Sequence, residues 1–498
     1  MPVLVLTLLA AALRFYGLGH QGFWYDEGST ALLVKFTPGQ MFGLIPHSES
    51  TPPLYYSVAW VWSRVFGDTE AGLRSLSAVA GVLVVPVAYF TAERLLRSRR
   101  AALITAALTA CNPLLIWYSQ EARAYALLVL LCALATLAFA YARSSRDPRL
   151  LGAWALASVL ALLTHYYAVV AIAPQAAWLL YERPRRRSVQ VAIACVVVCG
   201  LALIPLAVTQ SNHRNDAWIA RTSLRLRVAQ IVPQFLLGTG TPARVVLKFA
   251  AFALIAVALW LLVFRTRRRE RWPGLLAAGL AVAGFTLSLA FVVAGDDTLL
   301  TRNLLPLWLP CAMASAGGLA AARARRLGPA VALGLCGIGV TAAIGVAADY
   351  SLERPDWRPV AAALGRWPGG DAGRAASHGA RVVLVQDYLD RLPLALYMPG
   401  LEFFRGSRSA RVAELDVISI RSPGEPLCWW GAACNLISSR AQSDYPIPGF
   451  HEVSRRRIEQ FTITTMRAGD PVRLTRAELA SALTATRLSR DVTLIQGP

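Results

Sequence analysis

Long apolar stretches separated by short polar ones make up the first 350 residues. Windows of about 19 apolar residues, the length that crosses a bilayer, recur at 2–18, 74–93, 101–117, 125–142, 189–209, 246–264, 274–294, 304–322 and 329–348. A further stretch, 150–181, exceeds the roughly 20 residues of one crossing, and His165-Tyr166-Tyr167 interrupts its middle. We therefore expect two short helices that meet at His165, and about eleven transmembrane helices in all.

The pattern changes at about residue 349. Two short β-type runs and three helical patterns follow there, at 381–385 and 415–420 and at 356–366, 389–398 and 475–486. This alternation predicts a small α/β domain. The domain contains no phosphate-binding glycine loop and no His-Glu zinc motif, so nothing in it indicates catalysis. The predicted organisation is a transmembrane domain at 1–348 and an α/β domain at 349–498.

Composition and charge agree with a polytopic membrane protein. Hydrophobic residues make up 56% of the 498 residues and charged ones only 16%. The net charge of +21 would suit a nucleic-acid-binding protein, but the arginines gather in alternate short loops. The five groups are Arg94, Arg97, Arg99 and Arg100; Arg143, Arg146 and Arg149; Arg183 and Arg185 to Arg187; Arg265, Arg267 to Arg269 and Arg271; and Arg323, Arg325 and Arg326. The positive-inside rule places all five in the cytoplasm, so topology explains the charge without a nucleic-acid partner.

The remaining loops are then expected to face outward. They are 19–73, 118–124, 210–243, 295–303 and everything after about residue 349, and the His165 break lies at the same face. Lys35 and Lys248 are the only lysines beside many arginines, which points to a GC-rich bacterial genome. We expect a multi-pass protein of the bacterial cytoplasmic membrane, with its site and its C-terminal domain outside the cytoplasm.

Acids, imidazoles and arginines collect at this outward face. Asp26 and Glu27 follow the first apolar segment, and Glu121 and Arg123 follow the third. His165 and the run His213-Arg214 lie in further outward positions. Each group alone has a structural explanation, such as a helix dipole or an ion pair. Because ionised groups near a bilayer are costly, their gathering on one face indicates a functional site.

The order of these motifs resembles a known family. Trp-Tyr-Asp-Glu at 24–27, Thr-Pro-Pro-Leu-Tyr-Tyr at 51–56, Ser-Gln-Glu-Ala-Arg-Ala-Tyr at 119–125 and Thr-His-Tyr-Tyr at 164–167 are similar to motifs of bacterial GT-C glycosyltransferases. The resemblance covers roughly residues 10–350 and is strongest to the branch of protein O-mannosyltransferases and lipid A aminoarabinose transferases. It implies a polyprenyl-phosphate sugar donor, reached from the outer leaflet, and inversion at the anomeric carbon.

The resemblance also implies roles for single residues. Asp26 would be the general base that activates the acceptor hydroxyl, with Glu27 and Glu121 orienting the acceptor or holding a divalent metal ion. Arg302, in Thr-Arg-Asn-Leu-Leu-Pro at 301–306, would bind the donor phosphate. Further candidates for phosphate contact are Arg123, His165 and Arg214.

Metal and disulfide chemistry rest on fewer residues. His47, Glu49 and His213 would be the metal ligands if the fold brings them together, whereas Thr51 stands where the mannosyltransferases carry His before Pro-Pro. The sequence therefore leaves the binding of a divalent metal ion undecided.

Cys428 and Cys434 bracket five residues of the outward domain, where a disulfide is expected because that compartment is oxidising.

These observations predict a glycosyltransferase that moves a sugar from a polyprenyl-phosphate donor to a hydroxyl acceptor, which would be a glycan, lipid or protein. Two alternatives remain. A lipid-linked sugar flippase or transporter would also be polytopic, but transporters often have paired halves with matching broken segments, and the sequence shows one broken segment. A membrane scaffold that presents the α/β domain would not need an acid pair.

Overall fold

The computed structural model describes residues 1–213, 219, 222–365, 367, 379–385, 391–398, 400–404, 409–420, 447–475, 478–479 and 493–496. Its residues form two compact units, one of Met1–Gly19 and Leu33–Ala348 and the other of His20–Leu32 and Asp349–Pro498. Arg214, Cys428, Cys434 and most of the predicted helix 475–486 lie outside the described residues.

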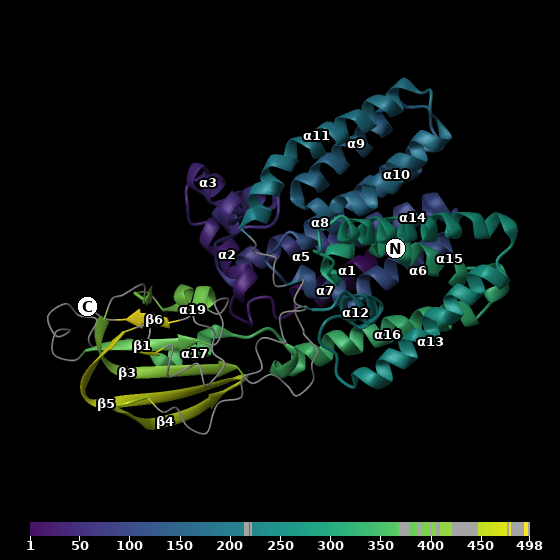
Figure 1. Cartoon of the computed structure of the whole chain (residues 1–498). Helices are drawn as coiled ribbons and strands as arrows, with labels where there is room; N and C mark the ends of the chain where they lie inside the picture. The colour runs from purple at the N-terminus through teal and green to yellow at the C-terminus, as the bar shows by residue number, and fades with distance from the viewer. Residues whose placement is uncertain are drawn as a thin grey trace. The chain divides into compact units, whose positions relative to one another are not determined.

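The first unit is helical, and every apolar stretch of the sequence forms a helix in it (Figure 1). Its elements are α1 (Pro2–Phe15), α3 (Pro38–Ser48), α4 (Leu54–Phe66), α5 (Glu70–Leu96), α6 (Arg99–Cys111), α7 (Pro113–Ser119), α8 (Tyr125–Ala142), α9 (Pro148–Thr164), η1 (Tyr166–Ala168), α10 (Val169–Glu182), α11 (Arg187–Asn212), α12 (Leu224–Leu237), α13 (Arg244–Trp260), the π-helical η3 (Leu261–Arg265), α14 (Arg268–Val293), η4 (Thr301–Leu307), α15 (Trp308–Leu319), η5 (Ala322–Ala324) and α16 (Leu327–Ala348).

Six of these helical segments are long and apolar enough to cross a membrane within the described part of the chain, and a bent pair brings the number to seven. The six are Glu70–Leu96, Tyr125–Ala142, Arg187–Asn212, Arg244–Arg265, Arg268–Val293 and Leu327–Ala348. Shorter apolar helices are Pro2–Phe15 and Pro148–Thr164. The protein is therefore a multi-pass helical membrane protein.

The bent pair is α6 and α7, which meet at an angle of 56°. Pro113 has no backbone N–H to offer the carbonyl of Thr109 four residues earlier. Arg14, fully buried in α1, supplies donors instead, to the carbonyl oxygens of Thr109 (3.1 Å) and Ala110 (3.0 Å). The carbonyl groups at the end of α6 thus accept hydrogen bonds from the protein itself, as a lipid environment requires.

The break in the 150–181 stretch occurs at the predicted residue. α9 ends at Thr164, and His165 has an extended backbone with φ −161° and ψ 134°. The His165 Nδ1 atom accepts the backbone N–H of Tyr167 (3.1 Å), which caps the short η1 helix before α10 begins. The imidazole therefore stabilises the start of the second half of the broken segment.

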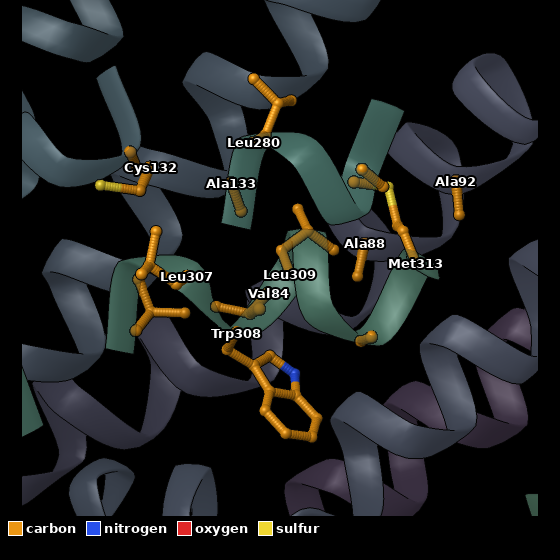
Figure 2. Close-up of a cluster of buried hydrophobic side chains, with 14 of the residues drawn as sticks. Val84, Ala88, Ala92, Cys132, Ala133, Leu280, Leu307, Trp308, Leu309 and Met313 are labelled. Atoms are coloured by element: carbon orange, nitrogen blue, oxygen red, sulfur yellow. The ribbon is translucent and has the colours of Figure 1, made fainter. Parts of the chain in front are cut away.

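A dry core joins the helices of the first unit. Figure 2 shows side chains that α5, α8, α14, η4 and α15 contribute to one cluster, among them Val84, Ala88, Ala92, Cys132, Ala133, Leu280, Leu307, Trp308, Leu309 and Met313. Each is less than a tenth exposed. Trp308 carries an indole N–H, which donates to the Thr109 hydroxyl (3.4 Å). This core fixes the helix ends from which the polar groups described below project.

The second unit contains a mixed six-stranded sheet with the order β2-β6-β1-β3-β5-β4. The strands are β1 (Ala380–Val385), β2 (Glu402–Phe403), β3 (Ser409–Ile420), β4 (Phe450–Ile458), β5 (Phe461–Thr475) and β6 (Thr493–Gln496). β1 and β3 are parallel, and the other pairs are antiparallel. The helices are α2 (Tyr25–Leu33), η6 (Tyr350–Leu352), α17 (Trp357–Leu364) and α19 (Arg391–Tyr397).

Alternation along β1 gives this sheet two apolar faces. Val383 and Val385 pack with α17 and α19, whereas Val382 and Leu384 pack on the opposite side with Leu415 and Met466. In Figure 1, α17 and α19 lie on the same face of the sheet. The runs at 381–385 and 415–420 and the helical patterns at 356–366 and 389–398 thus form strands and helices of one small mixed domain.

Glu353 makes the stability of this unit depend on pH. Gln21 donates to its Oε2 atom (2.6 Å), and burial raises the pKa of Glu353 to about 7. The folded chain therefore holds a proton that the unfolded chain releases at about pH 4.5, so stability falls as pH rises toward 7. We expect Glu353→Gln to flatten this fall between pH 5 and pH 7, measured as hydrogen exchange in α17 corrected for the intrinsic exchange rate at each pH. The exposed control Glu402→Gln should keep the wild-type slope; an unchanged slope in Glu353→Gln would contradict the prediction.

Candidate functional site

A buried ion pair joins the first outer loop to the turn between α7 and α8. The Glu49 Oε2 atom accepts from Arg123 Nη1 (2.8 Å) and from the Tyr56 hydroxyl (2.5 Å). The side chains of Glu49 and Arg123 are only 2% and 11% exposed. Burial raises the pKa of Tyr56 well above its usual value, so its hydroxyl stays a donor. The Glu49 Oε1 atom is buried and accepts no hydrogen bond from the residues that the structure describes.

Neutral polar groups hold this pair in place from two further elements. The Thr51 hydroxyl shares a hydrogen bond with Tyr56 (2.9 Å), and Gln210 of α11 donates to the carbonyl oxygen of Thr51 (3.0 Å). Tyr166, at the helix break, donates to Gln210 Oε1 (2.7 Å). Buried polar groups of this kind are costly unless satisfied, so the network fixes the first outer loop against α11 and the break.

Tyr125, at the start of α8, brings two more of the predicted residues together. The Arg302 guanidinium lies 5.7 Å from the centre of the Tyr125 ring, and the His165 ring lies 5.7 Å from it on a tilted plane. Tyr118 packs against the same ring at 4.8 Å. The negative face of an aromatic ring attracts a cation, so the Tyr125 ring stabilises the Arg302 guanidinium at this position.

His165 is neutral in this environment. Burial, together with the positive charges of Arg302 and Arg123, lowers its pKa to about 3. Its Nδ1 atom already accepts the Tyr167 N–H, so the proton of the neutral ring lies on Nε2. His165 can therefore donate a hydrogen bond to a ligand but cannot supply a positive charge.

A second ion pair positions the segment that carries Arg302. The Arg227 Nη2 atom in α12 donates to both carboxylate oxygens of Asp297 (2.6 and 2.7 Å), and its Nη1 atom donates to the backbone carbonyl oxygen of Leu299 (3.0 Å). The Tyr167 and Thr298 hydroxyls share a hydrogen bond (3.0 Å). These contacts tie the loop before η4 to α12 and to the His165 break, which limits the positions that Arg302 can take.

Glu121 is fully buried in the turn between α7 and α8. Its carbonyl oxygen accepts the N–H of Arg123 (2.8 Å), which sets the direction of the Arg123 backbone. Glu49, Glu121, Arg123, His165 and Arg302 all belong to the first unit. Four of them, Glu49, Arg123, His165 and Arg302, are linked by the contacts and charges given above.

The predicted metal ligands do not converge on one point. His47 and His213 share a hydrogen bond between Nδ1 and Nε2 (3.0 Å), and His213 Nδ1 lies 2.8 Å from the carbonyl oxygen of Thr209. Glu49 faces Arg123 instead. Within the described ranges, no three His, Cys, Asp or Glu side chains gather as metal ligands do. This donor set does not fit a divalent ion, so we derive no step through one.

The predicted acid pair lies in the second unit. Asp26 and Glu27 occupy the first turn of α2, where negative charge complements the helix dipole, and Glu27 is fully buried. The Phe23 N–H donates to the Tyr397 hydroxyl (2.6 Å), and a side chain at Gly28 would meet Leu392 of α19 at 3.2 Å. The segment before and within α2 is thus held by the C-terminal part of the chain.

Sequence reasoning missed Tyr56, Gln210, Arg227 and Asp297 as members of the site. Gln210 had one signal, since it is an amide in the last turn of an otherwise apolar helix. No sequence pattern indicated the pairing of Arg227 with Asp297, because seventy residues separate these two partners.

Breaking the Glu49–Arg123 pair should destabilise the fold more than breaking an exposed pair. Glu49→Gln leaves Arg123 buried without its counter-charge, which costs about 3–5 kcal/mol. The matched control is Glu182→Gln, which breaks the half-exposed pair with Arg143 and should cost less than about 1 kcal/mol. Thermal unfolding in detergent measures both. Equal losses would show that the Glu49 pair is solvated.

Comparison with known proteins adds a family match. Residues 50–210 match the model of the family described as dolichyl-phosphate-mannose-protein mannosyltransferase. The matched third of the chain contains Tyr56, Glu121, Arg123, His165 and Gln210. No curated protein sequence matches the chain.

Two solved structures are similar over nearly the whole chain. ArnT from Cupriavidus metallidurans in the apo state gives a TM-score of 0.56 at 14% identity, over 93% of this chain and 97% of that one. ArnT from the same organism bound to undecaprenyl phosphate gives a TM-score of 0.50 at 15% identity, with the same coverage. The chain has the polytopic helical fold of these structures. Together with the family match over residues 50–210, this similarity agrees with the resemblance seen in its motifs to GT-C membrane glycosyltransferases.

Proposed function

We propose that the protein transfers one sugar from a polyprenyl-phosphate donor to a hydroxyl acceptor, with inversion at the anomeric carbon. The observation that carries the proposal is the pair of Arg302 and His165 beside Tyr125, which offers a cationic and a neutral donor to one anion. Arg123 lies close enough to act on the same imidazole. The ArnT structure of the same fold binds undecaprenyl phosphate, which supports a lipid phosphate as that anion.

The chemistry needs a base and a group that stabilises the leaving phosphate. Asp26 takes the proton of the acceptor hydroxyl as its oxygen attacks the anomeric carbon. The bond from that carbon to the phosphate oxygen breaks, and the polyprenyl phosphate leaves with the electron pair. Glu27 and Glu121 orient the acceptor. The assignment of Asp26 is supported by the similarity of the run Trp24–Glu27 to the acidic first loop of the family.

Arg302 neutralises the charge that grows on the departing phosphate. Preorganised donors of this kind stabilise a transition state without reorganising. His165 adds a neutral Nε2–H donor, and Arg123 adds a second positive charge close enough to depress the pKa of the same imidazole. Arg214 remains a sequence-based candidate for the same phosphate.

The proposed orientation follows from the arginine-rich connections. They join α5 to α6, α8 to α9, α10 to α11, η3 to α14 and α15 to α16, and the positive-inside rule places all five in the cytoplasm. Eleven crossings, counting α1, α9, α10 and α15 as spans, put the polar site and the C-terminal domain outside the cytoplasmic membrane of a bacterium.

Labelling of single cysteines introduced at positions 98 and 220 by an impermeant thiol reagent tests this orientation. Position 220 should react in intact cells and position 98 should not, and the opposite result would reverse the topology.

The second unit acquires a role in this proposal, because it holds the segment that leads to Asp26. Tyr397→Phe leaves the Phe23 N–H without its acceptor, a loss of about 1–3 kcal/mol for a buried donor. We expect turnover to fall up to about a hundredfold through misplacement of the base, with donor affinity unchanged. Steady-state kinetics measures both. Tyr350→Phe, at an exposed tyrosine of the same unit, is the control, and an equal effect in both would remove this role from Tyr397.

A vesicle experiment separates the transferase from a flippase. Protein reconstituted with a labelled polyprenyl-phosphate sugar and an external hydroxyl acceptor should convert donor to free polyprenyl phosphate. A flippase would move the intact donor between leaflets and leave its sugar attached, and that outcome would replace the proposed reaction.

A further inference from the structure

A cavity lined by arginines lies at the end of the first unit opposite to the site described above. Arg146, Arg183, Arg185 and Arg186, with Pro184, line a volume of about 920 Å³. It is formed by the connection from α8 to α9 and by the connection from α10 to α11. His165 lies at the other end of α9, which at 1.5 Å per residue is about 25 Å long. The cavity is therefore separate from the proposed donor site.

Two of the four arginines build the cavity. Arg183 donates to the carbonyl oxygens of Ala142 (3.1 Å) and Ser145 (2.8 Å), and Arg186 donates to those of Ser145 (3.3 Å) and Arg146. These bonds hold the two connections together. Arg146 and Arg185 are exposed and extend the positive lining.

Two acids lie near the cavity, and Glu182 also interacts electrostatically with Arg183 of the lining. Glu182 is engaged by Arg143 through two Nε contacts of 3.1 Å and an Nη2 contact of 2.6 Å. Asp147 caps α9 by accepting the N–H of Arg149 (2.9 Å). Four guanidinium groups thus line one cavity whose described lining contains no carboxylate, an arrangement suited to an anion with several oxygen atoms.

The cavity lies at the level expected for lipid headgroups. Tyr141 in the last turn of α8 and Tyr181 in the last turn of α10 are 38% and 82% exposed, and the apolar faces of both helices end there. Exposed aromatic residues at the ends of apolar helices mark the membrane interface. A phosphate carried by a lipid would meet the arginines from this side.

We propose that this cavity binds the phosphate of an acidic phospholipid headgroup. The ligand chemistry is a phosphate oxyanion, and its source is the leaflet that surrounds the arginine-rich helix ends. The proposal is independent of the glycosyl transfer, because none of its residues belongs to the donor site.

Native mass spectrometry of the full chain in detergent, titrated with phosphatidylglycerol, phosphatidylcholine or inorganic phosphate, tests the proposal. Wild type should retain phosphatidylglycerol in preference to phosphatidylcholine. The double variant R146Q/R185Q, which leaves Arg183 and Arg186 in place to hold the loops, should bind it roughly thirtyfold more weakly, as expected for two arginines near an anionic headgroup. The matched control R149Q/R187Q removes the same charge from exposed neighbours outside the lining and should change binding less than about threefold, because the contact is local.

Equal losses in the two double variants would overturn the proposal, since they would show that diffuse positive charge attracts the lipid. Equal retention of phosphatidylcholine would do the same. Displacement of the lipid by an equal concentration of inorganic phosphate would assign the cavity to a soluble phosphate instead of a phospholipid. Thermal unfolding without added lipid should be the same for wild type and both double variants, which separates lost binding from lost folding.

Discussion

Asp26→Asn should lower turnover by about a hundredfold to ten-thousandfold, the range that a positioned general base contributes. Asparagine keeps the size and hydrogen-bonding shape of the side chain but cannot take the acceptor proton. Donor affinity should stay near that of wild type, because the assigned phosphate contacts come from Arg302, Arg123 and His165. Steady-state release of polyprenyl phosphate and a separate donor-binding titration measure the two effects.

The control for this variant is Asp68→Asn. Asp68 lies in the same outer loop and is exposed after α4, so its loss should leave turnover within about twofold, as for an ordinary surface substitution. If Asp26→Asn and Asp68→Asn both keep wild-type turnover, the base is another carboxylate. Glu49, whose Oε1 atom accepts no hydrogen bond from the described residues, would then be the next group to replace.

Arg302→Gln should reduce turnover by about a hundredfold to a thousandfold, as expected for loss of one donor to a developing oxyanion. Arg302→Lys should recover part of this loss, since it keeps the charge but not the fork of donors that matches a phosphate. Both variants should also weaken binding of polyprenyl phosphate itself. Product inhibition by polyprenyl phosphate measures that affinity directly.

Arg225→Gln is the matched control for Arg302, because Arg225 is exposed on α12 two residues before the buried Arg227. It should leave turnover and product inhibition unchanged. A variant Arg302→Gln that loses turnover but keeps full product inhibition would place Arg302 away from the phosphate and would assign that contact to Arg123.

The helices could be predicted because each is encoded locally. Apolar windows specified the helical segments, and the polar run His165–Tyr167 specified the break at which α9 ends. The bend between α6 and α7 also has a local cause in Asn112-Pro113. The hydrogen bonds that Arg14 donates to the carbonyl groups freed at this bend have no local cause. They join residues about a hundred positions apart, and no periodicity encodes such a partner.

The sequence predicted single candidate residues of the site but not the contacts between them. Glu121, Arg123 and His165 were singled out because polar groups are conspicuous in an apolar sequence, and Arg302 was singled out through the family resemblance. Their roles in the reaction stay predictions. The partner of Arg123 is Glu49, 74 residues away, and Glu49 was expected beside His47 and His213 as a metal ligand. Only the folded chain shows that the Arg123 guanidinium lies against this carboxylate.

The association of α2 with the C-terminal part of the chain also lies beyond local sequence. Residues 20–32 precede the rest of the second unit by more than 300 positions, yet Phe23 and Gly28 pack against Tyr397 and Leu392. Two hydrogen bonds, from the Phe23 N–H to Tyr397 and from Gln21 to Glu353, belong to this association. Neither produces a pattern in a hydropathy or propensity profile.

The most direct measurement incubates purified wild-type protein in nanodiscs with a panel of polyprenyl-phosphate sugars and hydroxyl acceptors. It quantifies free polyprenyl phosphate and glycosylated acceptor together. We predict that one donor yields the two products in equal amounts, with the opposite anomeric configuration in the new bond. Donor binding without release of polyprenyl phosphate, across the whole panel, would contradict the assignment of this protein as a transferase.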